Sequence, residues 1–322
     1  MSTIGAPRTL PPGIYVATLT FFDATTEELD IPTLQKHVIR LVISGVDGIV
    51  TLGSNGEAPH LSRAERQTVT REVRKTLDRA GFNKIPIIAG ASDASVRGTL
   101  YLCEDAAKAG ADAVLVLPPS YFTGAMSPKV ILQFYHDVAD RSPLPLLIYS
   151  FPAVSSGIAM DSDLIIKISA HPNIIGTKFT CGDTGKLARV AAVMPTKTPK
   201  QQTNEYIVLG GLADFTLQTF VAGGSGCIAG GGNLMPKLCK AVYNAFREGD
   251  LDSAMRLQAS LALGDWPHTR SGIGGTKAVL TSQFGYGGRP RRPLVPLTET
   301  AVASLNAEMA PVIETEKGLP TP

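Results

Sequence analysis

The sequence predicts an α/β protein, a (β/α)8 TIM barrel followed by a C-terminal helical extension. Short apolar runs rich in Val, Ile and Leu alternate with amphipathic stretches, and glycine, proline or polar residues bound each run. Strands that are apolar almost throughout are typical of parallel sheets buried on both faces, and each amphipathic stretch supplies the crossover that parallel strands need. Eight such units match a (β/α)8 barrel in number and length, with a doubly wound open sheet as the alternative.

The predicted strands follow directly from these runs. They are Gly13–Phe22, Gly48–Gly53, Pro86–Ala91, Ala113–Pro118, Pro145–Phe151, Ile174–Thr180, Tyr206–Gly211 and Gly226–Gly230. Helical spacing separates them, as in 31–43, where apolar residues recur on one face. Ser62 and Glu65 form a capping box that predicts a helix start, and Ser127-Pro128 and Asp161 mark two more.

The pattern changes after the eighth unit. We therefore place a catalytic barrel domain at residues 13–249 and a C-terminal helical region at residues 250–313. Its helical stretches lie near Asp250–Leu263, Gly274–Phe284 and Thr298–Ile313. Residues 1–12 and 314–322 are expected to be flexible termini.

Charge and composition argue against several functions. The net charge is +2 and the tightest basic run, 289–292, lies in a Pro/Gly-rich loop, so neither nucleic acid nor a membrane is the expected partner. The cysteines lack CxxC spacing, residues 1–12 lack the features of a signal or transit peptide, and no apolar run could span a bilayer, so we expect a cytoplasmic protein. The five histidines lack ligand spacing, so no metal and no cofactor is expected.

The candidate catalytic residues lie where predicted strands end, which is where such barrels hold their active sites. Lys178 lies in the apolar run 174–180, and burial there favours the neutral amine that can attack a carbonyl group. Tyr149 ends the neighbouring strand and brings a phenol that can exchange protons. The alternatives are a lysine that reaches solvent and a core tyrosine bonded to the backbone.

Two further strand ends carry polar groups. Gly53-Ser54-Asn55-Gly56 follows the second strand, and consecutive N–H groups in such a loop can bind a carboxylate, although the same residues also suit a plain turn. The Ser54 hydroxyl could pass a proton to or from Tyr149. Tyr121 follows the fourth strand and places a second phenol at the same end of the barrel.

Together these residues resemble the dihydrodipicolinate synthase/N-acetylneuraminate lyase superfamily of class I aldolases, over residues from about Gly13 to Ala262. The motifs that carry the resemblance are Gly-Ser-Asn-Gly-Glu (53–57), Tyr-Ser-Phe-Pro (149–152), Gly-Thr-Lys (176–178) and Gly-Ser-Gly-Cys-Ile-Ala (224–229). The resemblance implies that Lys178 forms a Schiff base with a pyruvate-type 2-oxo acid and that Tyr149 is the proton shuttle. It also implies a homotetramer in which Ser54 links Tyr149 to Tyr121 of a neighbouring subunit.

The resemblance also implies a binding site for the small-molecule substrate. The expected binding residues are Ser54 and Asn55 for the carboxylate, Gly211 and Ile228 for the pyruvate pocket, and Ser155 and Ser156 for the tail. No arginine follows Tyr-Ser-Phe-Pro closely, which argues against a dihydrodipicolinate synthase, and Asn55 stands where a sialic acid lyase usually has threonine. The motifs are most similar to those of 4-hydroxy-2-oxoglutarate aldolases and fungal 2-keto-3-deoxy-L-galactonate aldolases.

The sequence therefore predicts a class I aldolase that reversibly cleaves a 4-hydroxy-2-oxo or 3-deoxy-2-oxo acid to pyruvate, or a glyoxylate-type product, and an aldehyde. Within the superfamily, the alternatives are a dihydrodipicolinate synthase and a 2-oxo-acid dehydratase. Outside it, the alternatives are a metal-dependent aldolase or hydrolase, a nucleotide- or phosphate-binding protein, and a non-catalytic binding protein on the same barrel.

Overall fold

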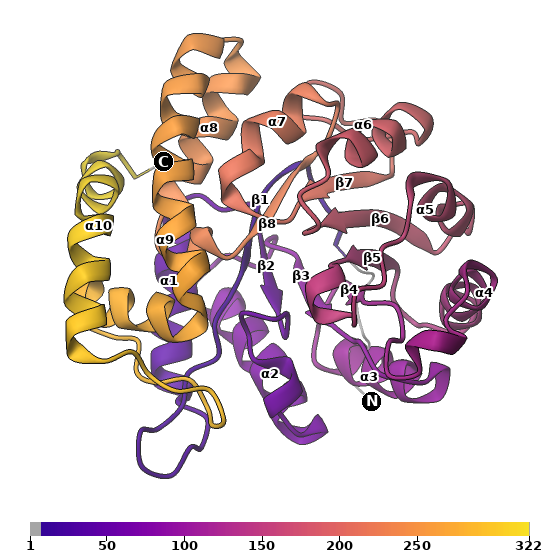
Figure 1. The fold of residues 1–322 in the computed structure, drawn as a ribbon, viewed down its shortest axis with the longest axis horizontal. Coiled ribbons are helices and arrows are strands. Elements are labelled where there is room, and N and C mark those ends of the chain that lie inside the picture. Colours follow the sequence, from indigo (N-terminus) through magenta and orange to yellow (C-terminus); the bar gives the residue numbers. More distant parts are fainter. Residues whose placement is uncertain (1–7, 322) are drawn as a thin grey trace.

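Eight parallel strands form a closed barrel in chain order, β1 to β8 (Figure 1). The computed structural model describes residues 8–321. The strands are β1 Gly13–Ala17, β2 Gly48–Thr51, β3 Ile87–Gly90, β4 Ala113–Val116, β5 Leu146–Ser150, β6 Ile174–Phe179, β7 Ile207–Gly210 and β8 Gly226–Ala229. The predicted (β/α)8 barrel is confirmed, and the open sheet is excluded because β1 pairs with β8.

Helices surround the barrel, as the crossover rule for parallel strands requires (Figure 1). They are α1 Ile31–Ile43, α2 Arg63–Arg79, α3 Val96–Lys108, α4 Pro128–Ala139, α5 Ser162–Ser169, α6 Thr184–Val193, α7 Thr216–Val221, α8 Pro236–Glu248, α9 Leu251–Phe284 and α10 Glu299–Gly318. The predicted capping box is present at α2, where the Ser62 hydroxyl accepts from Glu65 N and the Glu65 carboxylate accepts from Ser62 N.

The core has two layers, as expected for a barrel of this size. Inside the barrel, bulky side chains from several strands pack together, among them Tyr15, Val50, Leu115, Leu209 and Ile228. A larger cluster fills the space between the strands and the helices. The barrel interior is therefore solid below its mouth, and any cavity must lie at the strand ends.

The first strand is shorter than predicted. It ends at Ala17 rather than at Phe22, because the apolar residues that follow pack under the C-terminal region instead of extending the sheet. Phe21 contacts Tyr286 edge-on, with the ring centroids 6.0 Å apart, and the Thr20 hydroxyl donates to the Gly56 carbonyl.

The C-terminal region consists of two long helices, where the sequence suggested three helical stretches. The helix α9 runs through both of the first two and has a break at Gly272. It packs against α8 and α10 (Figure 1). The helix α10 continues beyond the expected end at 313 to Gly318, because Glu316 is buried and its carboxylate accepts from Lys237 N and Leu238 N at the start of α8.

The described part of the N-terminal segment also packs on the barrel. Leu10 is buried, and Arg8 donates to the carboxylate of Asp112. The packing of this segment, and the continuation of α10 to Gly318, differ from the flexible termini expected at 1–12 and 314–322. Residues 1–7 and 322 lie outside the described residues. No helix within 8–321 combines the length and hydrophobicity required to cross a membrane.

Candidate active site

Lys178 and Tyr149 meet at the mouth of the barrel. They are register partners on the neighbouring strands β6 and β5, so their side chains share the inner face. The Lys178 Nζ lies 3.2 Å from the Tyr149 hydroxyl oxygen, within hydrogen-bond distance. Both side chains are buried, with 3% and 4% of their surface exposed. The structure therefore places a nearly dry amine beside a phenol, as the sequence predicted.

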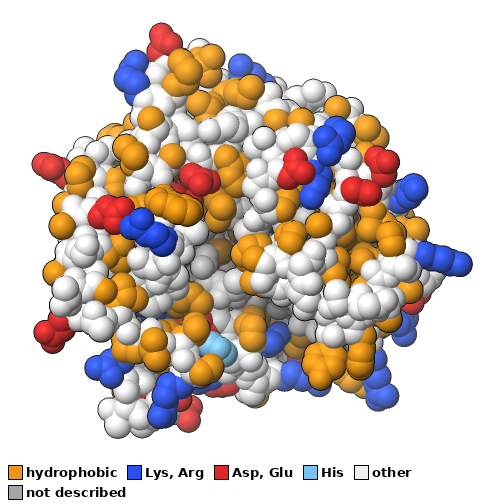
Figure 2. Space-filling view, viewed as in Figure 1, with side chains coloured by type: hydrophobic (Ala, Val, Ile, Leu, Met, Phe, Trp, Pro, Cys, Tyr) orange, Lys and Arg blue, Asp and Glu red, His pale blue; other side chains and the backbone are white. Residues whose placement is uncertain are grey.

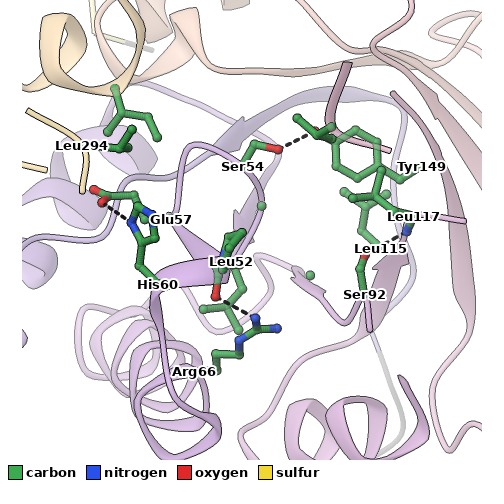
Figure 3. A pocket seen from close by; sticks show the side chains of 16 residues that line it. Leu52, Ser54, Glu57, His60, Arg66, Ser92, Leu115, Leu117, Tyr149 and Leu294 are labelled. Carbon is green, nitrogen blue, oxygen red and sulfur yellow. Dashed lines mark hydrogen bonds and ion pairs between the residues drawn. The ribbon is translucent and has the colours of Figure 1, made fainter. Parts of the chain in front are cut away.

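Ser54 extends this pair toward the loop after β2. Its Oγ lies 3.4 Å from the Tyr149 hydroxyl, and Figure 3 shows the two side chains pointing toward each other. The loop that carries Ser54 is held in unusual geometry, because Leu52 and Glu57 both adopt positive φ angles. Such conformations persist where surrounding contacts fix them, and they concentrate at functional sites.

Glu57 fixes the far end of that loop. Its carboxylate accepts from Lys277 Nζ of α9 at 2.7 Å, and both side chains are completely buried. It also accepts from the backbone N–H of Arg291 at 2.9 Å and lies 3.1 Å from His60 Nδ1. Glu57 therefore ties the β2 loop to the C-terminal region.

A cavity of about 230 Å³ opens above Lys178. Its lining comes from the loops after β2, β5, β6, β7 and β8 and from the middle of α9, and in Figure 2 this face is hollowed near its centre. Asn55 and Gly211, two of the predicted binding residues, line it. A side chain at Gly230 would collide with the Asn55 amide, with its Cβ 2.3 Å from Nδ2, so this glycine keeps the cavity open.

A second cavity of about 240 Å³ lies next to the first and shares Ser54 and Tyr149 with it (Figure 3). Four leucines line it, together with Arg66 and His60. The Arg66 guanidinium donates to the carbonyl oxygens of Ala58 and Leu61. The mouth therefore has a polar compartment above Lys178 and a more apolar one beside it.

Four predicted site residues of this chain do not line either cavity. Ile228 is completely buried in the barrel core, below the cavity. Ser155 is buried and its hydroxyl donates to the Phe151 carbonyl at 2.8 Å, so it stabilises its own turn instead of facing a substrate tail. Ser156 is exposed with a φ of 51°, and Tyr121 is 82% exposed on the loop after β4.

The structure adds five polar residues that the sequence analysis missed, namely Thr180, Asp265, His268, Thr269 and Thr276. Thr180 lines the polar cavity, and its buried hydroxyl has no hydrogen-bond partner within the described residues. Asp265, His268 and Thr276 come from α9, and they line the same cavity. No pattern in the sequence indicated this contact, because these residues lie far along the chain from Lys178 and are interspersed with apolar residues such as Trp266 and Pro267.

One carboxyl group beside this cavity has altered acidity. Burial, together with the nearby Asp265 carboxylate, raises the pKa of Asp214 to about 6. Its backbone N–H and that of Ala213 both donate to Asp265 Oδ2, at 3.1 and 3.0 Å. Among the residues described, no three His, Cys, Asp or Glu side chains are grouped so that they could hold a metal ion.

A closed (β/α)8 barrel with polar side chains gathered at the carboxyl ends of its strands is a scaffold typical of enzymes, whose active sites lie at this end of the barrel. The model of the dihydrodipicolinate synthetase family matches residues 10–310. This chain belongs to that family, and the predicted resemblance is confirmed.

Two curated relatives span the whole chain. The "L-threo-3-deoxy-hexylosonate aldolase" of Hypocrea jecorina is 49% identical over 98% of this chain and 100% of its own length. The "Probable 4-hydroxy-2-oxoglutarate aldolase, mitochondrial" of Emericella nidulans is 45% identical over 98% of this chain and 99% of its own length. The predicted class of enzyme, a carbon–carbon lyase, agrees with both names.

Solved structures of the family have the same fold. A dihydrodipicolinate synthase family protein from Coccidioides immitis is 38% identical, with a TM-score of 0.86 over 98% of this chain and 100% of that one. YagE, a prophage protein of the family from E. coli K12 solved in complex with pyruvate, is 27% identical, with a TM-score of 0.82 over 94% of this chain and 98% of that one.

Proposed function

We propose that this protein is a class I aldolase that cleaves a 4-hydroxy-2-oxo or 3-deoxy-2-oxo acid through an imine on Lys178. The observation that carries the proposal is the buried Lys178 amine 3.2 Å from the Tyr149 hydroxyl, at the base of a polar cavity. The names of the two curated relatives and the pyruvate bound to YagE support it.

The first half of the reaction builds the imine. The neutral Lys178 amine attacks the C2 carbonyl carbon of the 2-oxo acid, and the carbonyl oxygen takes a proton to give a carbinolamine. Tyr149 is the proton donor and acceptor in this step, and Ser54 at 3.4 Å from it passes protons onward. Loss of the carbinolamine hydroxyl as water leaves a protonated imine, with the substrate carboxylate held by the backbone N–H groups of Ser54 and Asn55.

The second half breaks the carbon–carbon bond. The 4-hydroxyl group loses its proton, the C3–C4 bond electrons move toward the positively charged imine nitrogen, and an aldehyde leaves. The resulting enamine takes a proton at C3, and water then hydrolyses the imine to release pyruvate and the free Lys178 amine. The protein supplies an amine, proton transfer and positioning for each of these steps.

Trapping with borohydride tests the imine. The full-length protein is incubated with pyruvate and reduced, and its peptides are analysed by mass spectrometry. We expect a reduced pyruvate adduct on Lys178. Lys186→Met is the matched control, because Lys186 is also a buried lysine after β6 but does not line either cavity at the barrel mouth. Lys178→Met should abolish the adduct and Lys186→Met should retain it, whereas an adduct on another lysine, or none on folded protein, would contradict the proposal.

A substrate panel then assigns the reaction. Release of pyruvate is measured with 4-hydroxy-2-oxoglutarate and with a 3-deoxy-2-oxo hexonate, which represent the activities that the two relatives' names describe. Water loss without aldehyde release would assign a dehydratase instead. Condensation with an amino-aldehyde but no cleavage of either acid would assign a dihydrodipicolinate synthase.

Assembly and compartment belong to the same proposal. Tyr121 and its neighbour Phe122 are 82% and 70% exposed, so they are free to reach a second copy. We expect a homotetramer in which Tyr121 of one copy approaches Ser54 of another, and light scattering of the pure protein checks its mass. We expect the cytoplasm as the compartment, and a mitochondrial signal from a fluorescent fusion of the full chain would contradict that.

A further inference from the structure

Three side chains of α9 form a hydrogen-bonded cluster on the wall of the polar cavity. His268 Nε2 lies 2.8 Å from Asp265 Oδ1, and His268 Nδ1 lies 3.2 Å from Thr276 Oγ1. We call Asp265, His268 and Thr276 the α9 cluster. All three are buried and all three line the cavity that holds Lys178. None of them has a role in the imine chemistry above.

A break in the helix brings the cluster together. Gly272 has φ 63° and ψ −161°, which interrupts the helical path between His268 and Thr276. Both flanking segments therefore present a polar side chain to the same cavity, and the Thr276 hydroxyl also lies 3.2 Å from the Gly272 carbonyl oxygen.

The cluster is fixed against the strand ends of the barrel. Asp265 Oδ2 accepts from two backbone N–H groups in the loop after β7. On the side of β8, a Cβ on Gly231 would lie 2.2 Å from Asp265 Oδ1, so the glycine leaves the space that the carboxylate occupies. Such rigid support is typical of groups that position a ligand.

The hydrogen-bond arrangement matches an alcohol ligand. Each nitrogen of His268 already has a partner, so the ring orients Thr276 instead of binding a ligand itself. The Thr276 hydroxyl donates to the Gly272 carbonyl oxygen, and its oxygen can still accept a hydrogen bond from a ligand. The buried Thr180 hydroxyl in the same cavity has no partner within the described residues. A ligand hydroxyl can donate to Thr276 and accept from Thr180.

The charges of the cavity match a neutral ligand. Among the described residues that line it, the basic side chains are Lys178, which the imine uses, and His268, which faces Asp265 at 2.8 Å. A second substrate carboxylate at the α9 cluster would therefore lie near the Asp265 carboxylate without a cation of its own, and burying an unpaired charge is costly. Neutral hydroxyl groups carry no such cost.

We infer that the α9 cluster is the subsite for the aldehyde half of the substrate and that it selects a neutral, hydroxylated aldehyde. This inference rests on the proposed aldolase function and refines it. The cluster takes the tail-binding role that the sequence suggested for Ser155 and Ser156. Thr276 is the contact residue, and His268 and Asp265 are positioning residues.

The test compares two substrates on Thr276→Val, which keeps the shape of the side chain and removes its hydroxyl. The loss of one neutral hydrogen bond should lower kcat/KM for a 3-deoxy-2-oxo hexonate by roughly three- to tenfold. For 4-hydroxy-2-oxoglutarate, whose tail is a carboxylate, we expect no change. Equal loss on both substrates, or loss on neither, would overturn the inference.

Two controls separate this result from loss of folding and from failure of the aldolase proposal. Thr219→Val removes another buried hydroxyl that bonds a backbone carbonyl within its helix segment but lies outside the cavity, and it should change neither substrate. Pyruvate trapping on Lys178 should be the same in Thr276→Val and in the unaltered protein. If the unaltered protein fails to trap pyruvate, the aldolase proposal itself fails. If trapping succeeds but the two substrates respond alike, only the subsite assignment fails.

If the Thr276→Val protein does not fold, a second measurement on another variant still tests the inference. In the condensation direction, at saturating pyruvate, His268→Asn should raise KM for glyceraldehyde more than KM for glyoxylate and leave kcat for glyoxylate unchanged. A purely structural role for His268 would lower kcat for both aldehydes together, and that outcome would also overturn the inference.

Discussion

Lys178 illustrates how a strand can bury an amine beside a polar partner. It lies in β6 between Thr177 and Phe179, both completely buried, and its amine has the Tyr149 hydroxyl as its hydrogen-bond partner. Leaving a buried polar group unpaired costs free energy, so the phenol stabilises the amine. In the proposed mechanism the same hydroxyl also transfers protons. Removing the Tyr149 hydroxyl tests whether turnover depends on it.

We expect Tyr149→Phe to lower kcat for retro-aldol cleavage by about 10²–10⁴-fold, the usual contribution of a positioned general acid or base. The measurement is steady-state release of pyruvate. The matched control is Tyr135→Phe, because Tyr135 is a buried tyrosine whose hydroxyl donates to the Val116 carbonyl at 2.8 Å. That variant should lose about 1 kcal/mol of stability and keep its kcat. Turnover by Tyr149→Phe close to that of the unaltered protein would show that protons move by another route.

The sequence predicted residues that share neighbouring strands and missed those that meet through the C-terminal region. Lys178 and Tyr149 could be paired because adjacent parallel strands end at the same edge of a barrel. Ser155 could not be placed correctly, since nothing in its sequence context showed that its hydroxyl bonds to Phe151 of its own turn. His268 depends on how α9 folds back over the mouth, which no local pattern encodes.

At the scale of elements, the break in α9 brings residues from both of its segments into the wall of the polar cavity. In a helix that continued straight through Gly272, the side chains of Thr276 and His268 would point in different directions around the helix axis. The backbone at Gly272 lies in a region that residues with a side chain almost never adopt. A Cβ there would meet no atom within 4 Å, so the demand for glycine is conformational and not steric.

Gly272→Ala should therefore lower the free energy of unfolding by about 1–3 kcal/mol. It should also lower kcat/KM for the substrate, because the α9 cluster would lose its alignment. Denaturant unfolding gives the stability, and the matched control is Gly124→Ala, where the added Cβ also meets nothing within 4 Å and the backbone angle is not in the left-handed region. An equal effect of the two substitutions would show that the break does not depend on glycine.

At the scale of the whole molecule, two of the buried contacts that attach the C-terminal region to the barrel involve glutamate side chains. The Glu57–Lys277 ion pair holds α9 to the β2 loop, and Glu316 holds α10 to the start of α8. The sequence predicted the barrel and the presence of C-terminal helices from local patterns. It could not predict these two attachments, because each joins residues more than 70 positions apart.

Removing one partner of the buried pair should be costly. Lys277→Met leaves the Glu57 carboxylate buried with only His60 and the Arg291 N–H as partners, and we expect a loss of about 3–5 kcal/mol in the free energy of unfolding. Adding Glu57→Gln should recover part of the loss. The control is Lys75→Met, which breaks the exposed Lys75–Glu72 pair and should cost less than about 1 kcal/mol. Similar losses for Lys277→Met and Lys75→Met would contradict this account.

The raised pKa of Glu316 predicts how the free energy of unfolding depends on pH. Burial raises the pKa of Glu316 to about 7, above the ordinary value of 4.5, although two backbone N–H groups favour its charged form. The native state therefore keeps this proton up to about pH 7, whereas the unfolded chain releases it near pH 4.5. Between these values the unfolded state binds fewer protons, so the free energy of unfolding falls as pH rises, by about 3 kcal/mol for this group.

Glu316→Gln removes this titration and keeps the shape of the side chain. We expect the stability difference, unaltered protein minus variant, to fall by about 3 kcal/mol from pH 4.5 to pH 7.5 and to stay level above that. Denaturant unfolding across this range measures it. Asp214, whose pKa is also raised, to about 6, contributes equally to both proteins and cancels in the difference. A difference that rises with pH would mean that the two N–H groups at the start of α8 outweigh burial, so that α10 is held by a carboxylate and not by a neutral acid.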